Sequence, residues 1–259
     1  MQLSAKTKGL LELVVMTGID TLAHSHCLQH VLTSYAGWDH PSSYLRQMRS
    51  LREKELLGYA SNKTAWIPSL TASGIENIAD RVAPERFWNI PWDGQWRTIT
   101  FDIPAQESRE RQRLNKWLKT NRFGHLQGSL WLSARPYEDW SQQIAAMDIE
   151  PSSVIFIEGK PLGLLSDESI VQHSWPWEDL HTRYQRYLNY VAENPPASQA
   201  GDPSASLANW FKKESTLWSS AIEIDPLLPR ELHPKNYLGP SGWETRQQAF
   251  QAWRELLQS

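Results

Sequence analysis

The stretch 91–133 constrains the fold of this chain most, because it predicts a strand, a helix and another strand in close succession. Residues 95–102 are rich in β-branched and aromatic side chains, which favour a strand. Residues 107–120 space their apolar side chains at i, i+3 and i+4 among arginines and lysines, as an amphipathic helix does. Residues 127–133 then predict a second short strand. The stretch therefore predicts a β-α-β unit.

Two further runs extend this unit toward a ferredoxin-like split βαβ domain. Residues 137–147 have the pattern of a helix, and residues 153–158 form an apolar, β-branched run short enough to be a buried strand. The pattern identifies no fourth strand. We expect an α+β central domain over residues 84–175.

The first 83 residues predict three helices followed by a hairpin. The helices are expected at 6–16, 25–35 and 41–57, and the hairpin strands at 58–60 and 65–67. Gly37 is the predicted stop of the second helix, because glycine favours the position after a helix end. Such a succession is typical of a winged helix-turn-helix. A linking helix over residues 71–82 is expected to follow.

The third predicted helix has an apolar side and a positively charged side. At about 100° per residue, the apolar side carries Tyr44, Leu45, Met48, Leu51 and Leu56. Arg52 also falls there, and we expect its charged end to reach water or a partner. Arginine and glutamine suit guanine and adenine edges in the major groove, whereas serine and lysine suit phosphates. The predicted DNA-binding residues are Ser42, Ser43, Arg46, Gln47, Arg49, Ser50, Lys54 and, at the hairpin tip, Lys63. The alternative is an ordinary solvated helix and hairpin.

The last third of the chain, residues 176–259, is expected to be a helical domain. Its helices are predicted at 177–191, 206–222 and 243–257. Residues 225–239 contain three prolines, which exclude a regular helix or strand throughout this segment. The predicted domains are therefore 1–83, 84–175 and 176–259.

The composition limits which classes of protein this chain can belong to. The formal net charge is −3, so DNA binding would need a local positive patch. A single cysteine, Cys27, excludes an intramolecular disulfide. The sequence contains no apolar run of membrane-spanning length and no secretory signal pattern, so we expect a cytoplasmic protein without membrane association. Fourteen tryptophans are expected to fill several small cores, with an aromatic ligand cage as the alternative.

The sequence contains no G-x-S-x-G, P-loop or G-x-G-x-x-G motif. His26 and His30, at i and i+4 near His24 and Cys27, could share a metal on one helical face. However, no second cysteine and no H-E-x-x-H arrangement completes such a site. We therefore expect no catalytic residue, no metal and no cofactor, and hence no enzyme.

The winged-helix pattern is followed by P-W-D-G-Q-W, R-F-G-H-L-Q-G-S-L-W-L-S and D-P-L-L-P-R-E-L-H-P-K-N-Y-L-G. In this order, over nearly the whole chain, these motifs resemble the PaaX family of bacterial transcriptional repressors. The resemblance implies an N-terminal winged helix, a central ferredoxin-like domain and a C-terminal helical domain. It also implies a homodimer that represses transcription from a palindromic operator in double-stranded DNA. Because the founding members respond to phenylacetyl-CoA, we expect release by a small effector, an acyl-CoA or another aromatic or carboxylic metabolite.

The hairpin departs from the family pattern. The family usually has a basic R-x-G-R-x-S-x-Y run there, whereas this chain has A-S-N-K-T-A-W. Only Lys63 carries over as a hairpin contact, and we expect a changed operator. We expect the effector between the central and C-terminal domains, since small-molecule pockets concentrate in such clefts. The cations available for its anionic groups are Arg183, Arg186, Lys212, Lys213, Arg230 and Lys235.

The central motifs also resemble the small ferredoxin-fold endonucleases of CRISPR adaptation. In those enzymes an aspartate at the end of the first strand binds a divalent metal across a dimer interface, and Asp102 stands at that position. This resemblance supports an alternative function, a metal-dependent nuclease. The other interpretation of Asp102 is structural, because aspartate is a favoured turn residue and Pro104 follows it.

Overall fold

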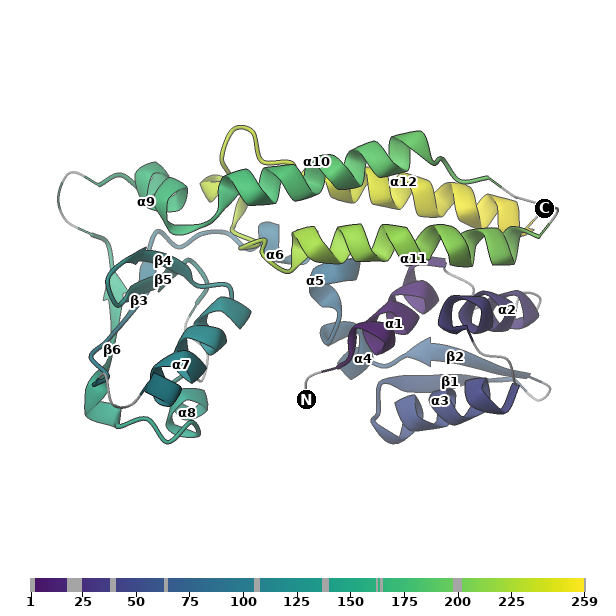
Figure 1. The fold of residues 1–259 in the computed structure, drawn as a ribbon, viewed down its shortest axis with the longest axis horizontal. Coiled ribbons are helices and arrows are strands. Elements are labelled where there is room, and N and C mark those ends of the chain that lie inside the picture. Colours follow the sequence, from purple (N-terminus) through teal and green to yellow (C-terminus); the bar gives the residue numbers. More distant parts are fainter. Residues whose placement is uncertain are drawn as a thin grey trace. The chain divides into compact units, whose positions relative to one another are not determined.

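A computed structural model describes residues 3–17, 25–37, 41–62, 65–104, 108–136, 140–161, 163, 165–197 and 202–258. The chain forms two compact units (Figure 1). The first unit comprises Met1–Pro84, Thr182–Glu223 and Leu238–Ser259. The second unit comprises Glu85–His181 and Ile224–Tyr237. The N-terminal segment and most of the C-terminal helical segment therefore share one unit.

The second unit is built on a four-stranded antiparallel sheet. Its strands are β3 (Trp96–Phe101), β4 (Gly124–Gln127), β5 (Leu130–Ser133) and β6 (Val154–Gly159), in the order β4-β5-β3-β6. Helix α7 (Ser108–Thr120) follows β3, and helix α8 (Trp140–Ala145) follows β5. This order and these crossovers are those of a split βαβ domain, so the prediction of a ferredoxin-like central domain is confirmed.

The prediction of a single strand over residues 127–133 was wrong. This segment contains the turn of a hairpin, with β4 ending at Gln127 and β5 beginning at Leu130. Gly128 lies in the turn with φ of +54°, a left-handed conformation that glycine adopts without steric cost. The hairpin supplies the fourth strand that the sequence pattern did not identify.

Apolar cores lie on both faces of this sheet, but the expectation of a buried strand over residues 153–158 was wrong, because β6 is an edge strand whose Ile155 and Ile157 are exposed. The core on one face includes Ile99 from the sheet and Leu114 and Leu118 from α7, all fully buried. The core on the other face includes Trp96, packed with residues of α9 (Asp167–Ser174) and with Leu228 and Leu232 of the loop after α11. Helix α9 and the short helix α6 (Glu85–Trp88) were not predicted.

The loop at residues 225–237 of the second unit is irregular apart from one short 3-10 turn, η4 (Arg230–Leu232), as its prolines predicted. Buried Asp225 holds both ends of the loop. Its Oδ1 accepts a hydrogen bond from the backbone N–H of Leu227 at 2.8 Å, and its Oδ2 accepts one from the Tyr237 hydroxyl at 2.6 Å. This aspartate therefore fixes the shape of the proline-rich motif.

In the first unit, the three N-terminal helices and the hairpin form as predicted. They are α1 (Ala5–Thr17), α2 (Ser25–Ala36), α3 (Pro41–Glu53), β1 (Leu57–Asn62) and β2 (Ala65–Leu70). Gly37 follows α2 with φ of +64°, which confirms it as the helix stop. Helix α3 ends four residues earlier than predicted, and Glu55, with φ of +56°, lies between it and β1. The predicted linking helix divides into α4 (Ala72–Glu76) and α5 (Ala79–Val82).

The C-terminal helices are α10 (Trp177–Glu193), α11 (Pro203–Ile222) and α12 (Gly239–Gln258), and the boundary between the two units falls within α10. Within the first unit, α1 packs against α12 and α2 packs against α11. The core of this unit is therefore made by both ends of the chain. Buried tryptophans fill the cores of both units, as predicted: Trp88, Trp96, Trp131, Trp140, Trp175, Trp210, Trp218, Trp243 and Trp253.

Candidate nucleic-acid interface

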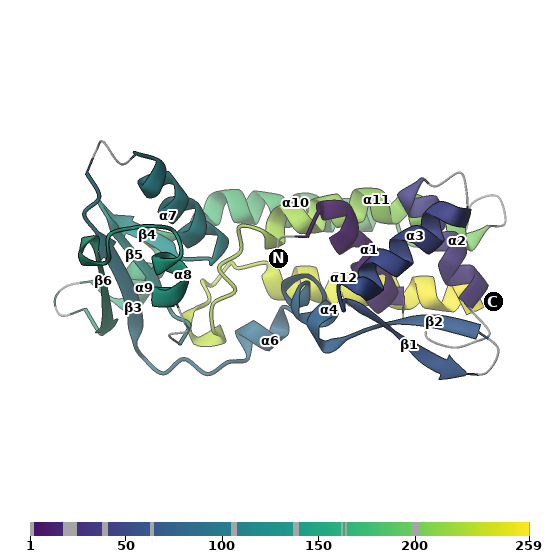
Figure 2. The ribbon, with the colours of Figure 1, turned by 90° about the horizontal axis from the view of Figure 1, so that it is seen from below.

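Helix α3 presents an exposed face rich in arginine. Met48 and Leu51 are buried on its opposite side, and the helix packs against α2 and β1. Figures 1 and 2 show α3 next to β1. The exposed residues of α3 are Ser42, Leu45, Arg46, Arg49, Arg52 and Glu53. Their spacing of three and four residues places them along one side of the helix. Three arginines and one glutamate give the helix a charge of +2, although the whole chain carries −3.

The predicted DNA-binding residues fall into three groups. Ser42, Arg46 and Arg49 lie on the exposed face, and Lys54 is exposed just after the helix. The half-buried residues on the flank of the helix are Ser43, Gln47 and Ser50. Lys63 lies outside the described residues.

The expectation that Leu45 lies on the apolar side of α3 was wrong. Its side chain is 59% exposed, because it lies about 60° round the helix from buried Met48. Arg52, also expected on the apolar side, is exposed. Leu45 therefore lies next to Ser42 and Arg49, at i−3 and i+4, on the face that carries the arginines. An exposed apolar side chain in this setting can contact a thymine methyl group.

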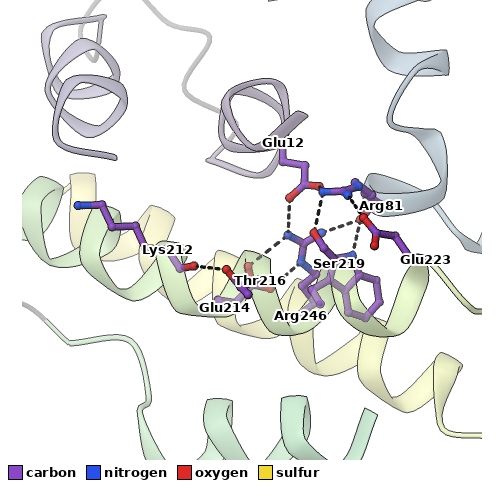
Figure 3. Close-up of polar contacts among 9 residues, drawn as sticks. Glu12, Arg81, Lys212, Glu214, Thr216, Ser219, Glu223 and Arg246 are labelled. Atoms are coloured by element: carbon purple, nitrogen blue, oxygen red, sulfur yellow. Dashed lines mark hydrogen bonds and ion pairs between the residues drawn. The ribbon is translucent and has the colours of Figure 1, made fainter. Parts of the chain in front are cut away.

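In the same unit, four buried charged side chains join both ends of the chain. Figure 3 shows Glu12 of α1, Arg81 of α5, Glu214 of α11 and Arg246 of α12 turned toward one another. Arg246 Nε donates to Glu214 at 2.7 Å, and its Nη2 donates to Glu12 at 3.3 Å. Arg81 Nη1 donates to Glu12 at 2.9 Å. We call these four residues the buried charge cluster.

The buried charge cluster is balanced, with two carboxylates and two guanidinium groups. Glu12, Glu214 and Arg246 have no exposed side-chain surface, and Arg81 is 4% exposed. Burial opposes the positive charge of Arg246, but Glu214 and Glu12 raise its pKa above the usual range, so it stays charged. One sign of the cluster is visible in the sequence, since Glu12 is a lone carboxylate within the apolar run L-L-E-L-V-V.

Asp102 lies in a cavity of about 580 Å³ in the second unit. Arg111, Lys119 and His125 line the same cavity. The cationic side chains of Arg111 and Lys119 disfavour a divalent ion, and a nuclease metal site needs several oxygen ligands. Among the described residues, no cluster of three or more His, Cys, Asp or Glu side chains is placed to hold a metal. The geometry therefore does not favour the nuclease alternative.

The other candidate metal ligands were His26 and His30 of α2. The side chain of His26 lies outside the described part of the structure, and His30 is exposed.

The cations predicted for effector binding belong to different units. Arg183 of the first unit is half-buried and donates to the backbone carbonyl of Ser220 at 2.7 Å. Arg230 of the second unit donates to the Asn89 side chain at 2.7 Å. Five of the six are exposed: Arg186, Lys212, Lys213, Arg230 and Lys235. None of the six lines the cavity around Asp102.

Residues 89–171 match the family described as the PaaX protein central Cas2-like domain. Among solved structures, the chain is similar to the uncharacterized protein Rv0674 from Mycobacterium tuberculosis, with a TM-score of 0.62 and 14% sequence identity over 99% of this chain and 100% of that chain. No curated protein matches the chain. Within the described residues, the helices are too short or too polar to cross a membrane. The family match confirms the resemblance drawn from the sequence motifs.

Proposed function

We propose that this PaaX-family protein is a homodimeric transcriptional repressor that binds a palindromic operator through α3 and is released by a small effector. The observation that carries the proposal is the exposed arginine face of α3, a local charge of +2 on a chain of −3. Positive charge of this kind attracts the phosphate backbone, and arginine side chains read guanine edges.

The surroundings of α3 support its assignment as the recognition helix of a winged helix-turn-helix. It follows α2 after a short connection and packs on it, as the second helix of such a motif does. The antiparallel hairpin of β1 and β2 follows directly and corresponds to the wing. In this arrangement Arg46 contacts base edges, while Arg49 and Lys54 contact phosphates.

One α3 helix covers one half of an operator, so a palindrome requires a two-fold dimer. An effector can release the DNA only if its affinity is higher for the arrangement of the protein that does not bind DNA. Equal affinity for both arrangements would not shift the equilibrium between them.

The test is an unbiased selection of DNA sequences by the full chain, followed by sedimentation. We expect a two-fold symmetric motif whose half-sites lie about one helical turn apart, and a dimer at micromolar concentration. The proposal of a dimeric repressor would be contradicted if the selected sequences lacked symmetry and the protein sedimented as a monomer with and without DNA.

We further propose that the protein is not a nuclease. Purified protein with magnesium or manganese is expected to leave single- and double-stranded DNA uncut, because Arg111 and Lys119 lie beside Asp102. Asp102→Asn is expected to bind DNA like the parent, because Asp102 is far from α3 in the sequence. Gel analysis of labelled DNA measures cleavage. Metal-dependent cutting that is lost in Asp102→Asn would make the nuclease the better interpretation.

A further inference from the structure

A cavity of about 470 Å³, open to solvent, lies in the first unit, and Arg81 of the buried charge cluster lines it. Its volume is within the range of small-molecule pockets. Helices α1, α2, α5 and α11 contribute its walls. Five of the lining residues carry hydroxyl groups: Tyr35, Ser215, Thr216, Ser219 and Ser220. Arg81, Lys6 and Glu223 supply the charges.

We propose that this cavity binds a small carboxylate, which takes the place of the Glu223 carboxylate on Arg81. In the structure, Arg81 Nη2 pairs with Glu223 at 2.9 Å, while Nη1 donates to Glu12 at 2.9 Å and to Ser219 Oγ at 2.6 Å. The buried Nε of Arg81 has no hydrogen-bond partner among the described residues. The guanidinium thus has an unused donor as well as a partner that can be exchanged.

Glu223 is suited to exchange because it is held only at the surface. Its side chain is 62% exposed, whereas that of Arg81 is 4% exposed. It is the C-cap residue of α11, so it can turn into water without moving the helix. Ion pairs with an exposed partner are weak, since water solvates the released charge well. Buried Glu12, by contrast, cannot leave Arg81 without losing its partners.

Glu223 is one of two carboxylates that pair with Arg81, and Glu12 is the other. Glu12 also pairs with Arg246, so the two guanidinium groups share its charge. When Glu223 turns into water, the wall of the cavity gains one positive charge. A carboxylate ligand restores the balance, and an uncharged amide of the same shape does not.

The hydroxyl groups provide the remaining hydrogen bonds. Ser219 accepts from Arg81, so its own proton is available to a ligand oxygen. Burial and the nearby Glu12 raise the pKa of Tyr35, which therefore remains protonated and can donate. A Cβ atom at Gly9 would lie 2.2 Å from the Tyr35 hydroxyl oxygen, so glycine leaves the space that this hydroxyl occupies.

The test is calorimetric titration of the full chain with benzoate and with its uncharged analogue benzamide, in a buffer free of carboxylates. Benzoate is expected to bind at least about tenfold more tightly than benzamide, since only benzoate carries the charge that Arg81 needs. Glu223→Gln removes the competing carboxylate and is expected to tighten benzoate binding about two- to fivefold. Tyr35→Phe removes one donor and is expected to weaken it about tenfold. The matched control is Glu193→Gln, an exposed glutamate at the end of α10, which should bind like the parent.

Equal binding of benzoate and benzamide would overturn the proposal, and so would a Glu223→Gln protein that binds benzoate no more tightly than the parent. Absence of binding to benzoate, butyrate and succinate in both proteins would overturn it as well. The inference goes beyond the repressor function, and the titration contains no DNA. A failure to bind an operator is therefore distinguishable from a failure to bind the carboxylate.

Discussion

Replacing Arg246 by leucine is expected to lower the free energy of unfolding by about 3–5 kcal/mol. Arg246 has no exposed side-chain surface, and it donates to both carboxylates of the buried charge cluster and, at 2.6 Å, to the backbone carbonyl of Arg81. Without it, the fully buried Glu214 carboxylate loses the guanidinium that neutralises it. An uncompensated buried carboxylate costs much more than a broken ion pair at the surface.

Two comparisons isolate this effect from the loss of packing and of overall charge. Arg186→Leu removes an exposed arginine from α10 and should change the free energy of unfolding by about 0.5 kcal/mol or less. The double variant Arg246→Leu/Glu214→Leu removes the charge pair together and should regain a large part of the loss, because no unpaired carboxylate remains. Urea unfolding followed by tryptophan fluorescence measures all three. A double variant less stable than Arg246→Leu would show that packing, and not charge, dominates.

Replacing Arg46 by alanine is expected to weaken operator binding by about 1–3 kcal/mol for each base that the arginine reads. The effect should be specific, because a side chain that reads a base edge discriminates between sequences. Binding to the selected operator should therefore weaken more than binding to unrelated DNA, and the preference at one position of each half-site should relax.

Lys54→Ala is the matched comparison, since Lys54 is also exposed but is assigned to phosphate. It should weaken binding to all sequences alike and reduce the slope of log affinity against log salt by about one for each phosphate that the lysine neutralises. Binding titrations with operator and scrambled DNA at several salt concentrations separate the two variants. An Arg46→Ala protein with unchanged affinity and sequence preference would remove α3 from the role of recognition helix.

The sequence predicted the order of elements well, because periodic apolar residues decide whether a segment forms a helix or a strand. It failed where a single residue changes the local geometry. Gly128 turns the chain inside what looked like one strand, and Glu55 separates α3 from β1 with a positive φ. Neither conformation leaves a periodic signal. The exposure of Leu45 was missed because a helical wheel locates a face only to within about one residue.

The candidate sites were predictable to different degrees. The exposed arginines of α3 follow from the residue types and their spacing, so Arg46 and Arg49 could be named from the sequence. The buried charge cluster and its cavity could not, because Arg246 lies 234 residues from Glu12 and neither local sequence encodes the partner. The carboxylate site depends on Glu223, whose importance becomes visible only when Arg81 is placed beside it.

The packing of α1 against α12 has a consequence for the order of events during protein synthesis. The helices nearest the proposed DNA-reading surface are made first, yet Glu12 and Arg81 acquire Arg246 only after nearly all of the chain has left the ribosome. Until then two buried charges lack part of their compensation. A chain that ends before α12 therefore lacks Arg246 and cannot complete the buried charge cluster.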